Sequence, residues 1–368
     1  MTATSVLAGA ERQVAPVPAA RRRPRRARQL LVASGIGILL VVSVLLGAAI
    51  GAVHIPVGDV VGTLLWKAGL GDPPPAQSRE VLWQIRIPRL ALALSIGAGL
   101  GLAGALLQGV FRNPLADPGI IGVSAGAAVG ASVAIVSGAE LISMAGLGTV
   151  TLAAFTTGVA TVFLVYGFAR HEGRTEIVTL VLTGIAINAM ALGVLGLMTF
   201  LADDEELRTL SFWTLGSLAG ATWPGVMFAG PAAIACCLAA PWLARGLDTL
   251  ALGELEAEHL GVRVERLRVI AVAMAALITS AAVAVAGMIG FVGLVVPHLV
   301  RLAAGPGHRF LLPASALGGA AITALADLAS RTLALPQEVP LGVVTALVGG
   351  PFFLWLLHRT RSEHGGWR

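Results

Sequence analysis

The sequence predicts an all-α integral membrane protein with about ten transmembrane helices. Hydrophobic residues make up 56% of the 368 residues and charged residues only 12%, and a soluble core could not bury so much apolar surface. The apolar residues also occur in runs of about 20, the length that crosses a bilayer as a helix. The alternation typical of a membrane barrel is absent, so we expect one helical domain over residues 30–358.

Ten apolar segments follow one another along the chain, joined by polar or proline-rich connections. The expected spans lie near residues 30–53, 90–111, 119–137, 147–169, 177–201, 224–244, 269–287, 289–304, 310–329 and 339–358. The longest early connection, residues 54–88, contains three consecutive prolines and is too polar for a helix in lipid. An even number of spans puts both termini on one side of the membrane.

A cluster of arginines precedes the first span, within the basic tail formed by residues 1–29. This position is typical of a cytoplasmic anchor under the positive-inside rule, and we expect no nucleic-acid partner. The short tail 359–368 then also lies in the cytoplasm. The basic residues left on the outer side are few: Lys67, Arg79, Arg86, Arg89, Arg208 and Arg331.

The longest polar interruption in the second half of the chain is residues 246–268, on the predicted cytoplasmic side. Asp248 predicts the start of a short helix that stops near Gly253, and the residues from Glu254 onward predict a second short helix that Gly261 ends. The acidic residues of the second helix lie in its first turn, which suits the helix dipole. The alternative is a solvated loop.

Signals for catalysis or metal binding are weak. A Walker A loop needs a lysine after glycine, and the sole lysine, Lys67, lies in the sequence LLWKAGL. The chain is therefore not itself an ATPase. Cys236 and Cys237 are adjacent within an apolar segment and indicate neither a disulfide framework nor a metal site. We predict no catalytic residue, no metal site and no cofactor bound by this chain.

Small residues recur at four-residue spacing within two of the spans. Such spacing lets helix backbones approach closely in a membrane. It predicts helix packing through Gly97, Gly101, Gly122, Gly126 and Gly130.

Three polar residues lie in or near spans: Asn188, His298 and Asp327. Ionisable groups at such positions are candidates for proton coupling. The alternative is structural, because each lies near a helix end or beside Pro or Gly, where a polar side chain can satisfy freed backbone groups.

Several segments in order closely resemble the FecCD-type permeases of ABC importers, which move iron chelates, haem and cobalamin. They read WQIRIPRLALALSIGAGLGLAGALLQGVFRNPLADPGIIGVSAGAAVGA, LALGELEAEHLGV, GMIGFVGLVVPHLVRL, ADLASR and EVPLGVVTALVGGPFFLWLL. The resemblance runs from about residue 57 to 357. It implies a type II ABC importer permease-like fold, and it identifies a transport subunit rather than an enzyme.

The resemblance also implies the partners and the location. In this family a second copy of the chain completes a central path, and a cytoplasmic ATPase dimer carries ATP and Mg. A periplasmic or lipid-anchored binding protein delivers the substrate. We expect a multi-pass protein of the bacterial inner (plasma) membrane, surrounded by lipid, with both termini cytoplasmic.

The family's functional residues map onto two regions of the sequence. In the family, the loop between the sixth and seventh spans forms coupling helices on the ATPase, which here is 248–262. The coupling residues expected are Asp248, Leu250, Leu252, Gly253, Glu254, Leu255, Glu256, Glu258, His259, Leu260 and Gly261. The docking residues expected for the binding protein are Arg86, Arg89 and Arg331, since guanidinium groups bind carboxylates well. Alternatively, Arg86 and Arg89 are interfacial residues at the start of a span.

The cargo is expected to be an iron complex. Residues 207–223, LRTLSFWTLGSLAGATW, resemble haem-transporting members more than siderophore-transporting ones. Haem is therefore the first expectation, followed by a ferric siderophore and cobalamin. The alternative from a different class is a proton-coupled secondary carrier that uses Asp327 and His298.

Overall fold

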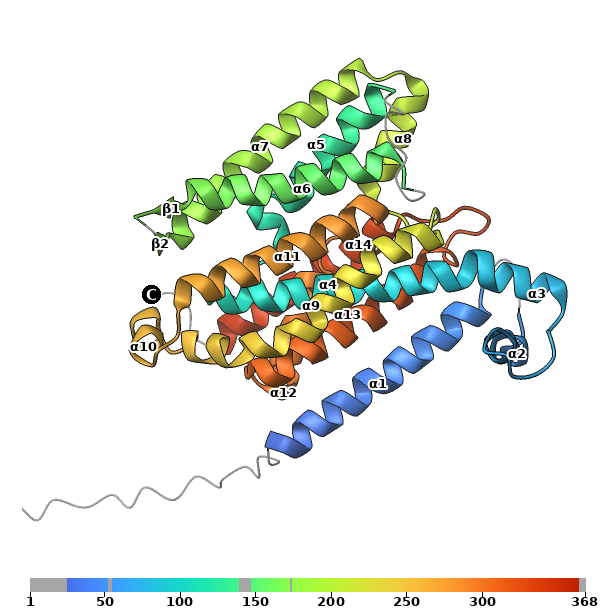
Figure 1. Ribbon diagram of the computed structural model, residues 1–368, viewed down its shortest axis with the longest axis horizontal. Coiled ribbons are helices and arrows are strands. Elements are labelled where there is room, and N and C mark those ends of the chain that lie inside the picture. The colour runs from blue at the N-terminus through green and yellow to red at the C-terminus, as the bar shows by residue number, and fades with distance from the viewer. Residues whose placement is uncertain (1–24, 52–54, 139–146, 173, 364–368) are drawn as a thin grey trace, which may run out of the picture.

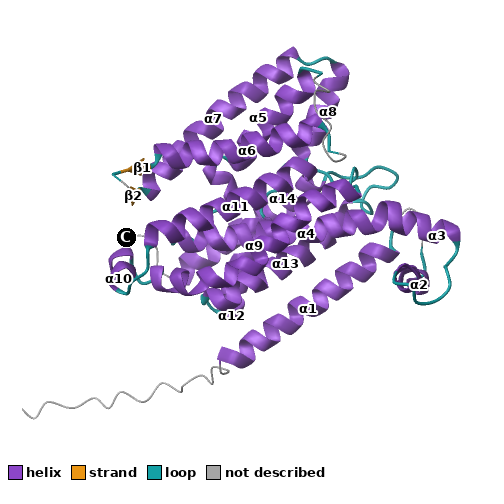
Figure 2. Ribbon diagram, in the orientation of Figure 1, coloured by secondary structure: helices purple, strands orange, loops and turns teal. Residues whose placement is uncertain are grey.

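The computed structural model describes residues 25–51, 55–138, 147–172 and 174–363, and these residues are almost entirely helical (Figures 1 and 2). The first half contains α1 (Arg25–Ala49), α2 (Val57–Lys67), α3 (Ala76–Val81), the π-helical turn η1 (Leu82–Arg86), α4 (Ile87–Val110), the 3₁₀ turn η2 (Pro118–Ile121), α5 (Val123–Val136), α6 (Thr149–Phe168) and α7 (Ile177–Leu201). The second half contains α8 (Asp204–Leu215), α9 (Trp223–Leu250), α10 (Glu254–His259), α11 (Val264–Ala286), α12 (Val292–Ala304), α13 (His308–Ser330) and α14 (Leu341–Glu363). Two strands of two residues, β1 (Arg170–His171) and β2 (Arg174–Thr175), pair in the turn between α6 and α7.

Each expected span coincides with a helix. Seven helices among the described residues are long and apolar enough to cross a membrane: α1, the continuous helix that ends in α4, α6, α7, α9, α11 and α13. Shorter apolar helices, α5, α12 and the apolar part of α14, occupy the other three positions. The predicted all-α membrane fold is confirmed.

Helix α4 forms the centre of the bundle and packs against α9, α11, α12 and α13 (Figure 1). The packing is close because α4 carries glycines where neighbouring backbones approach. A Cβ atom at Gly97 would lie 2.3 Å from the Gly319 carbonyl oxygen, and one at Gly101 would lie 2.2 Å from the Ser315 carbonyl oxygen. Side chains larger than hydrogen would separate α4 from α13.

Helices α5, α6 and α7 form a second group, which lies along one side of the α4 bundle in Figure 1. Gly126 and Gly130 of α5 face α6, where a Cβ atom would lie 2.1 Å from the hydroxyls of Thr161 and Thr157, respectively. Gly122 lies between η2 and α5 with a φ of +81°.

Helices α5 and α12, of 14 and 13 residues, are shorter than a typical span. At about 1.5 Å per residue, neither crosses a hydrocarbon core of about 30 Å by itself. Irregular backbone precedes each of them and lies close to other helices: a Cβ atom at Gly184 of α7 would lie 2.0 Å from the Ile120 carbonyl oxygen, and one at Gly342 of α14 would lie 2.7 Å from the Met288 carbonyl oxygen. Irregular backbone is tolerated at membrane depth where protein covers it.

Three connections differ from the expectation. Residues 54–88 contain α2 and α3, and α3 continues through η1 into α4, so this helix begins well before residue 90. The acidic residues near 203–206 begin a helix, α8, in which Asp203 and Glu206 form a capping box. Helix α9 continues to Leu250 with Pro231 and Pro241 in its interior, so the sixth span extends beyond residue 244.

The bundle has two ends. In Figure 1, α10 and the β1–β2 turn lie at one end, which we call the α10 end, and α2, α3 and α8 lie at the opposite end, which we call the α8 end. The predicted coupling residues gather at the α10 end, and the predicted docking arginines lie where α1 and α13 finish, at the α8 end.

Candidate functional site

Helix α10 is a six-residue helix between α9 and α11. Gly253 precedes it with a φ of +142°, and Gly261 follows it with a φ of +84°. Residues with a side chain rarely adopt such backbone conformations, so the two glycines set the limits of the helix. Glu254 and Glu256 lie in its first turn and His259 in its last, which matches the helix dipole.

Leucine side chains on and beside α10 are exposed. Leu252, Leu255 and Leu260 are 68%, 65% and 66% exposed, whereas Ala257 on the same short helix is fully buried. Exposed apolar groups that cluster outside the spans are typical of a surface that contacts another protein. This surface lies within the predicted coupling segment, whose role stays a prediction.

The prediction that Asp248 begins a short helix is wrong. Asp248 and Leu250 lie in the last turns of α9, so α10 is the one separate short helix between α9 and α11. The Asp248 carboxylate instead accepts hydrogen bonds from the backbone N–H and the Nδ1 atom of His308, both at 2.8 Å. It therefore caps the first turn of α13 and joins the ends of α9 and α13.

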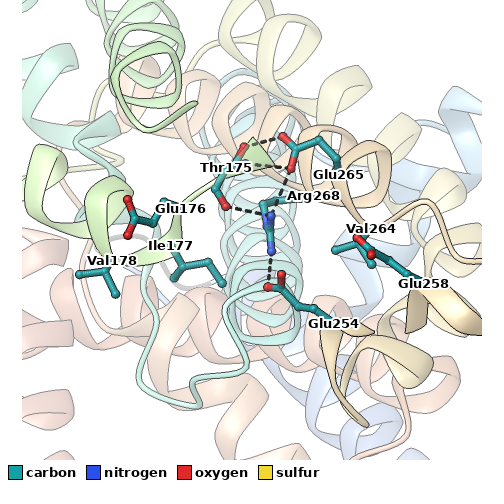
Figure 3. Close-up of a pocket in the computed structure, with 9 residues that line it drawn as sticks. All are labelled: Thr175, Glu176, Ile177, Val178, Glu254, Glu258, Val264, Glu265 and Arg268. Carbon is teal, nitrogen blue, oxygen red and sulfur yellow. Dashed lines mark hydrogen bonds and ion pairs between the residues drawn. The ribbon is translucent and has the colours of Figure 1, made fainter. Parts of the chain in front are cut away.

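A buried arginine links α10 to its neighbours (Figure 3). The side chain of Arg268, in α11, is 3% exposed. Its Nη2 atom lies 2.5 Å from Oε1 of Glu254, and its Nη1 atom donates to the Thr175 carbonyl oxygen at 3.0 Å and to Oε2 of Glu265 at 3.2 Å. One guanidinium thus contacts α10, the end of β2 and its own helix.

Glu265 extends this polar cluster to the turn between α6 and α7. Its carboxylate accepts hydrogen bonds from the backbone N–H of Thr175 at 3.2 Å, from the Thr175 hydroxyl at 2.5 Å and from the hydroxyl of Tyr166. The carboxylate therefore binds residues on both sides of the β1–β2 turn. We name Glu254, Arg268, Glu265, Thr175 and Tyr166 the Arg268 cluster.

A pocket of about 560 Å³ lies beside the Arg268 cluster, between α10 and the start of α7 (Figure 3). Glu254 and Glu258 line it on the α10 side, and Glu176, Ile177 and Val178 line it on the α7 side. Helix α10 and the start of α7 are thus separated by this pocket, and the Arg268 guanidinium joins them at its edge.

The predicted docking arginines are buried at the α8 end, with exposures of 5%, 7% and 9% for Arg86, Arg89 and Arg331. Arg86 donates to the carbonyl oxygens of Ala48 and Ala49 at 2.5 and 2.8 Å, and Arg331 donates to that of Gly47 at 2.6 Å. These are the last carbonyl groups of α1, which lack partners within their own helix. Arg86 and Arg331 thus hold the end of α1.

Asp327 lies between two of these arginines. Its Oδ1 atom accepts from Nε of Arg89 at 2.8 Å, and its Oδ2 atom lies 3.6 Å from Nε of Arg331. Arg89 also pairs with Glu338 at 2.9 Å, and the Glu338 side chain is 40% exposed. We name Arg86, Arg89, Arg331, Asp327 and Glu338 the arginine cluster.

A smaller cavity of about 230 Å³ lies between α5 and α7. Its lining consists of small and apolar residues together with Ser124 and Asn188: Gly119, Ser124, Ala125, Ala128, Asn188, Ala191, Leu192, Leu195 and Met288. The Asn188 amide donates to the Gly119 carbonyl oxygen at 3.2 Å, so this predicted candidate satisfies the irregular backbone before α5.

Comparisons with known proteins place this geometry in a family. The model of the FecCD transport family matches residues 39–359. The chain belongs to the FecCD transport family. It is 39% identical over 332 residues to the hemin transport system permease protein HmuU of Yersinia pestis, covering 90% of this chain and 97% of that protein. It is 42% identical over 295 residues to the cobalamin import system permease protein BtuC of Halobacterium salinarum, covering 80% and 78%.

A solved structure agrees with the assignment to the FecCD family. An inward-facing conformation of a metal-chelate type ABC transporter has a TM-score of 0.78 and 32% identity, covering 90% of this chain and 99% of that one. The chain is a permease subunit of an ABC importer, and a separate ATPase hydrolyses the ATP. Transport therefore involves ATPase and substrate-binding partners, and the alternative of a proton-coupled secondary carrier is wrong.

Within this FecCD permease, Asp327 and His298 have different surroundings. Asp327 is neutralised by Arg89 and Arg331. Neither ring nitrogen of His298 has a hydrogen-bond partner among the described residues, and both are buried. The ion pairs of Asp327 with Arg89 and Arg331 therefore favour the structural alternative for this residue, in which its carboxylate balances the charge of buried basic groups.

The sequence interpretation missed the Arg268 cluster as a site. It assigned none of Arg268, Glu265, Thr175 and Tyr166 to a site. The signal was a pair of opposite charges three residues apart, at 265 and 268, which places them on one face of a helix start. The partners from the α6–α7 turn come from about 90 residues earlier and could not be identified by spacing.

Proposed function

We propose that this permease translocates an intact iron complex, with haem as the first candidate. The lining of the cavity between α5 and α7 carries the proposal, because it offers small and apolar surfaces to a bulky cargo rather than a set of charged ligands. A metal that enters such a path is best carried inside a complex that already satisfies its coordination. Haem, a large planar complex with apolar edges, has this character.

The hemin permease among the relatives supports haem. The hemin permease aligns over 97% of its length, and the cobalamin permease is slightly more identical over 78% of its length. Cobalamin, a cobalt complex, is therefore the main alternative to an iron complex, and a ferric siderophore is the second candidate among the iron complexes. All three are bulky complexes, so a path lined by small and apolar side chains would suit each of them.

We infer that α10 receives the motion of the ATPase. The three exposed leucines offer an apolar contact surface. Gly253 and Gly261, which bound α10, define a compact helix that can dock as a unit. ATP and Mg would then bind to the ATPase and not to this chain. The α10 end faces the cytoplasm in this proposal, with both termini on the same side in a bacterial inner membrane.

We also infer that the arginine cluster faces the substrate-binding protein. The Glu338 side chain is 40% exposed and pairs with Arg89, so a carboxylate of the binding protein competes with it for the Arg89 guanidinium. A second copy of the chain would complete the path. Helix α7, which lines the cavity, leaves large apolar side chains exposed, including Leu182, Leu192 and Phe200.

Reconstituted uptake tests the cargo. The permease, its ATPase and its binding protein are placed in proteoliposomes, and ATP-driven accumulation of haem, cyanocobalamin and ferric dicitrate is measured separately. We expect accumulation of haem that requires both ATP and the binding protein. Accumulation of cyanocobalamin or ferric dicitrate with no haem would overturn the haem proposal and identify the cargo in the same experiment.

A further inference from the structure

We propose that Arg268 is a positioning residue that makes α10 and the start of α7 move together, so that motion at α10 changes the cavity between α5 and α7. The proposal rests on the proposed role of α10 in receiving the ATPase motion. It goes beyond that role because it identifies the side chain that transmits the motion from α10 to α7.

The first link joins Arg268 to α10. The Glu254 carboxylate lies in the first turn of α10, and its Oε1 atom is 2.5 Å from Nη2 of Arg268. The arginine side chain is 3% exposed, whereas that of Glu254 is 43% exposed. Separating the two would leave a buried charge without this partner, which is unfavourable. Glu254 therefore tends to stay with the guanidinium when α10 moves.

The second link joins Arg268 to the α6–α7 turn. Its Nη1 atom donates to the Thr175 carbonyl oxygen and to Glu265, and Glu265 in turn binds the backbone and hydroxyl of Thr175. Thr175 is 5% exposed and lies two residues before Ile177, the first residue of α7. Displacement of the guanidinium therefore acts on the start of α7.

The third link runs along α7 to the cavity. A Cβ atom at Gly184 would lie 2.0 Å from the Ile120 carbonyl oxygen, and Asn188 donates to the Gly119 carbonyl oxygen. These two contacts bind α7 to η2, and Asn188, Ala191 and Leu195 line the cavity. A helix transmits an axial or tilting displacement along its length, so its first turn and the cavity wall are mechanically connected.

An arginine suits this position for a geometric reason. The guanidinium is planar, always charged and carries donors on two edges, so one group can hold a carboxylate on one edge and a carbonyl on another. The pocket of about 560 Å³ separates α10 from α7 on one side of this bridge. That open volume would let the two elements move independently if the bridge were absent.

Uptake per ATP hydrolysed tests the proposal in the assembled complex, with haem as the probe. We expect Arg268→Gln and Glu254→Gln each to move about fivefold less haem per ATP hydrolysed, as for a lost coupling between sites. The double variant should be no worse than the more severe single variant, because both changes break the same link. Arg266→Gln, an exposed arginine on the same helix, is the matched control and should retain the ratio.

An unchanged ratio of haem to ATP in Arg268→Gln would overturn the proposal. This includes the case in which hydrolysis and uptake fall by the same factor, which a purely structural role predicts. If Arg268→Gln does not assemble, Glu254→Gln decides the question, because its half-exposed side chain tolerates the substitution better. Arg268→Lys, which keeps the charge without the planar fork, should recover part of the ratio.

A distance measurement tests the link without any cargo. Spin labels are attached at Glu256→Cys in α10 and Val178→Cys in α7, with Cys236 and Cys237 replaced by Ala. We expect one distance distribution with and without ATP and vanadate in the native background, and different distributions in Arg268→Gln. Identical distributions in both backgrounds would refute the link. Failure of the coupling role of α10 itself would appear elsewhere, as normal ATPase stimulation in a Leu255→Asp variant.

Discussion

At the scale of single residues, two groups of buried charges in this permease are paired within the chain. Asp327 has Arg89 on one carboxylate oxygen and Arg331 on the other, and Arg268 has two glutamates and a carbonyl group around its guanidinium. Isolated charges are expensive in an apolar interior, and each of these pairs removes much of that penalty. The charged residues of the spans thus hold helices together.

We expect Asp327→Asn to destabilise the permease strongly. The substitution leaves the buried guanidinium groups of Arg89 and Arg331 without their shared anion, and breaking such a buried pair costs about 3–5 kcal/mol. Thermal unfolding of the purified permease in detergent would show a lower Tm. Glu338→Gln is the matched control: this side chain is 40% exposed, so we expect a loss of at most about 1 kcal/mol. Equal Tm values for the two variants would contradict the assignment.

We expect Gly104→Ala to reduce stability and expression. A Cβ atom at Gly104 would lie 1.7 Å from the Gly293 carbonyl oxygen, and backbone cannot yield as a flexible side chain does. Overpacking of this kind costs about 1–3 kcal/mol. The checks are yield and Tm, with Gly37→Ala as control because nothing lies within 4 Å of a Cβ atom there. A normal Tm for Gly104→Ala would show that α4 and α12 can separate at low cost.

At the scale of elements, the sequence predicts the spans well and their connections poorly. Each span is defined by apolar length, a property that any 20-residue window reveals. The end of α9 is different. Asp248 has the chemistry of a helix cap, and it does cap a helix, but the helix is α13, and the backbone it binds, at His308, is 60 residues away. Local spacing identifies a capping side chain without identifying the helix it caps.

We expect Leu255→Asp and Leu260→Asp to lower stimulation of the ATPase by cargo-loaded binding protein. Both side chains are exposed on the α10 surface, and a charge there would disfavour an apolar contact. Insertion of the permease in the membrane should be normal because neither residue lies in a span. The measurement is ATP hydrolysis by the complex. Leu255→Met, which keeps an apolar side chain at this position, is the control, and full stimulation in the Asp variants would remove these leucines from the coupling surface.

Reversal of charge in the arginine cluster should have two separable effects. Arg331→Glu removes the donor to the Gly47 carbonyl group of α1, so we expect a lower Tm as well as weaker association with the binding protein. Arg86→Glu should behave similarly. Association is measured as the Kd at several salt concentrations, since a docking contact between charges weakens with salt. A lower Tm with an unchanged Kd would limit both arginines to holding α1.

At the scale of the whole molecule, burial divides the spans into two kinds. The apolar windows of α11 and of the helix that ends in α4 are 72% buried and that of α13 is 67% buried, whereas those of α1 and α7 are 11% and 17% buried. The first group forms a core within one chain. The second group presents its apolar surface to lipid or to a second copy, and the sequence alone could not separate the groups because each of these helices contains an apolar window long enough to cross a membrane.

Removal of Mg from the assembled importer should stop transport without unfolding the permease. Chelation by EDTA deprives the ATPase of the metal that ATP hydrolysis needs, so ATP-driven uptake should fall to background. The Tm of the isolated permease should be the same with and without EDTA, because we expect no metal site in this chain. A decrease in the Tm of the isolated permease would reveal a structural metal.

The short helices α5 and α12 also constrain how the protein enters the membrane. A segment of 13 or 14 apolar residues is a weak signal for the insertion machinery, which favours stretches of about 20. Each of these helices follows a longer one in the chain, α4 and α11, respectively. During synthesis the short helices therefore have to enter together with longer neighbours, as hairpins, so that insertion and the packing of irregular backbone happen in the same step.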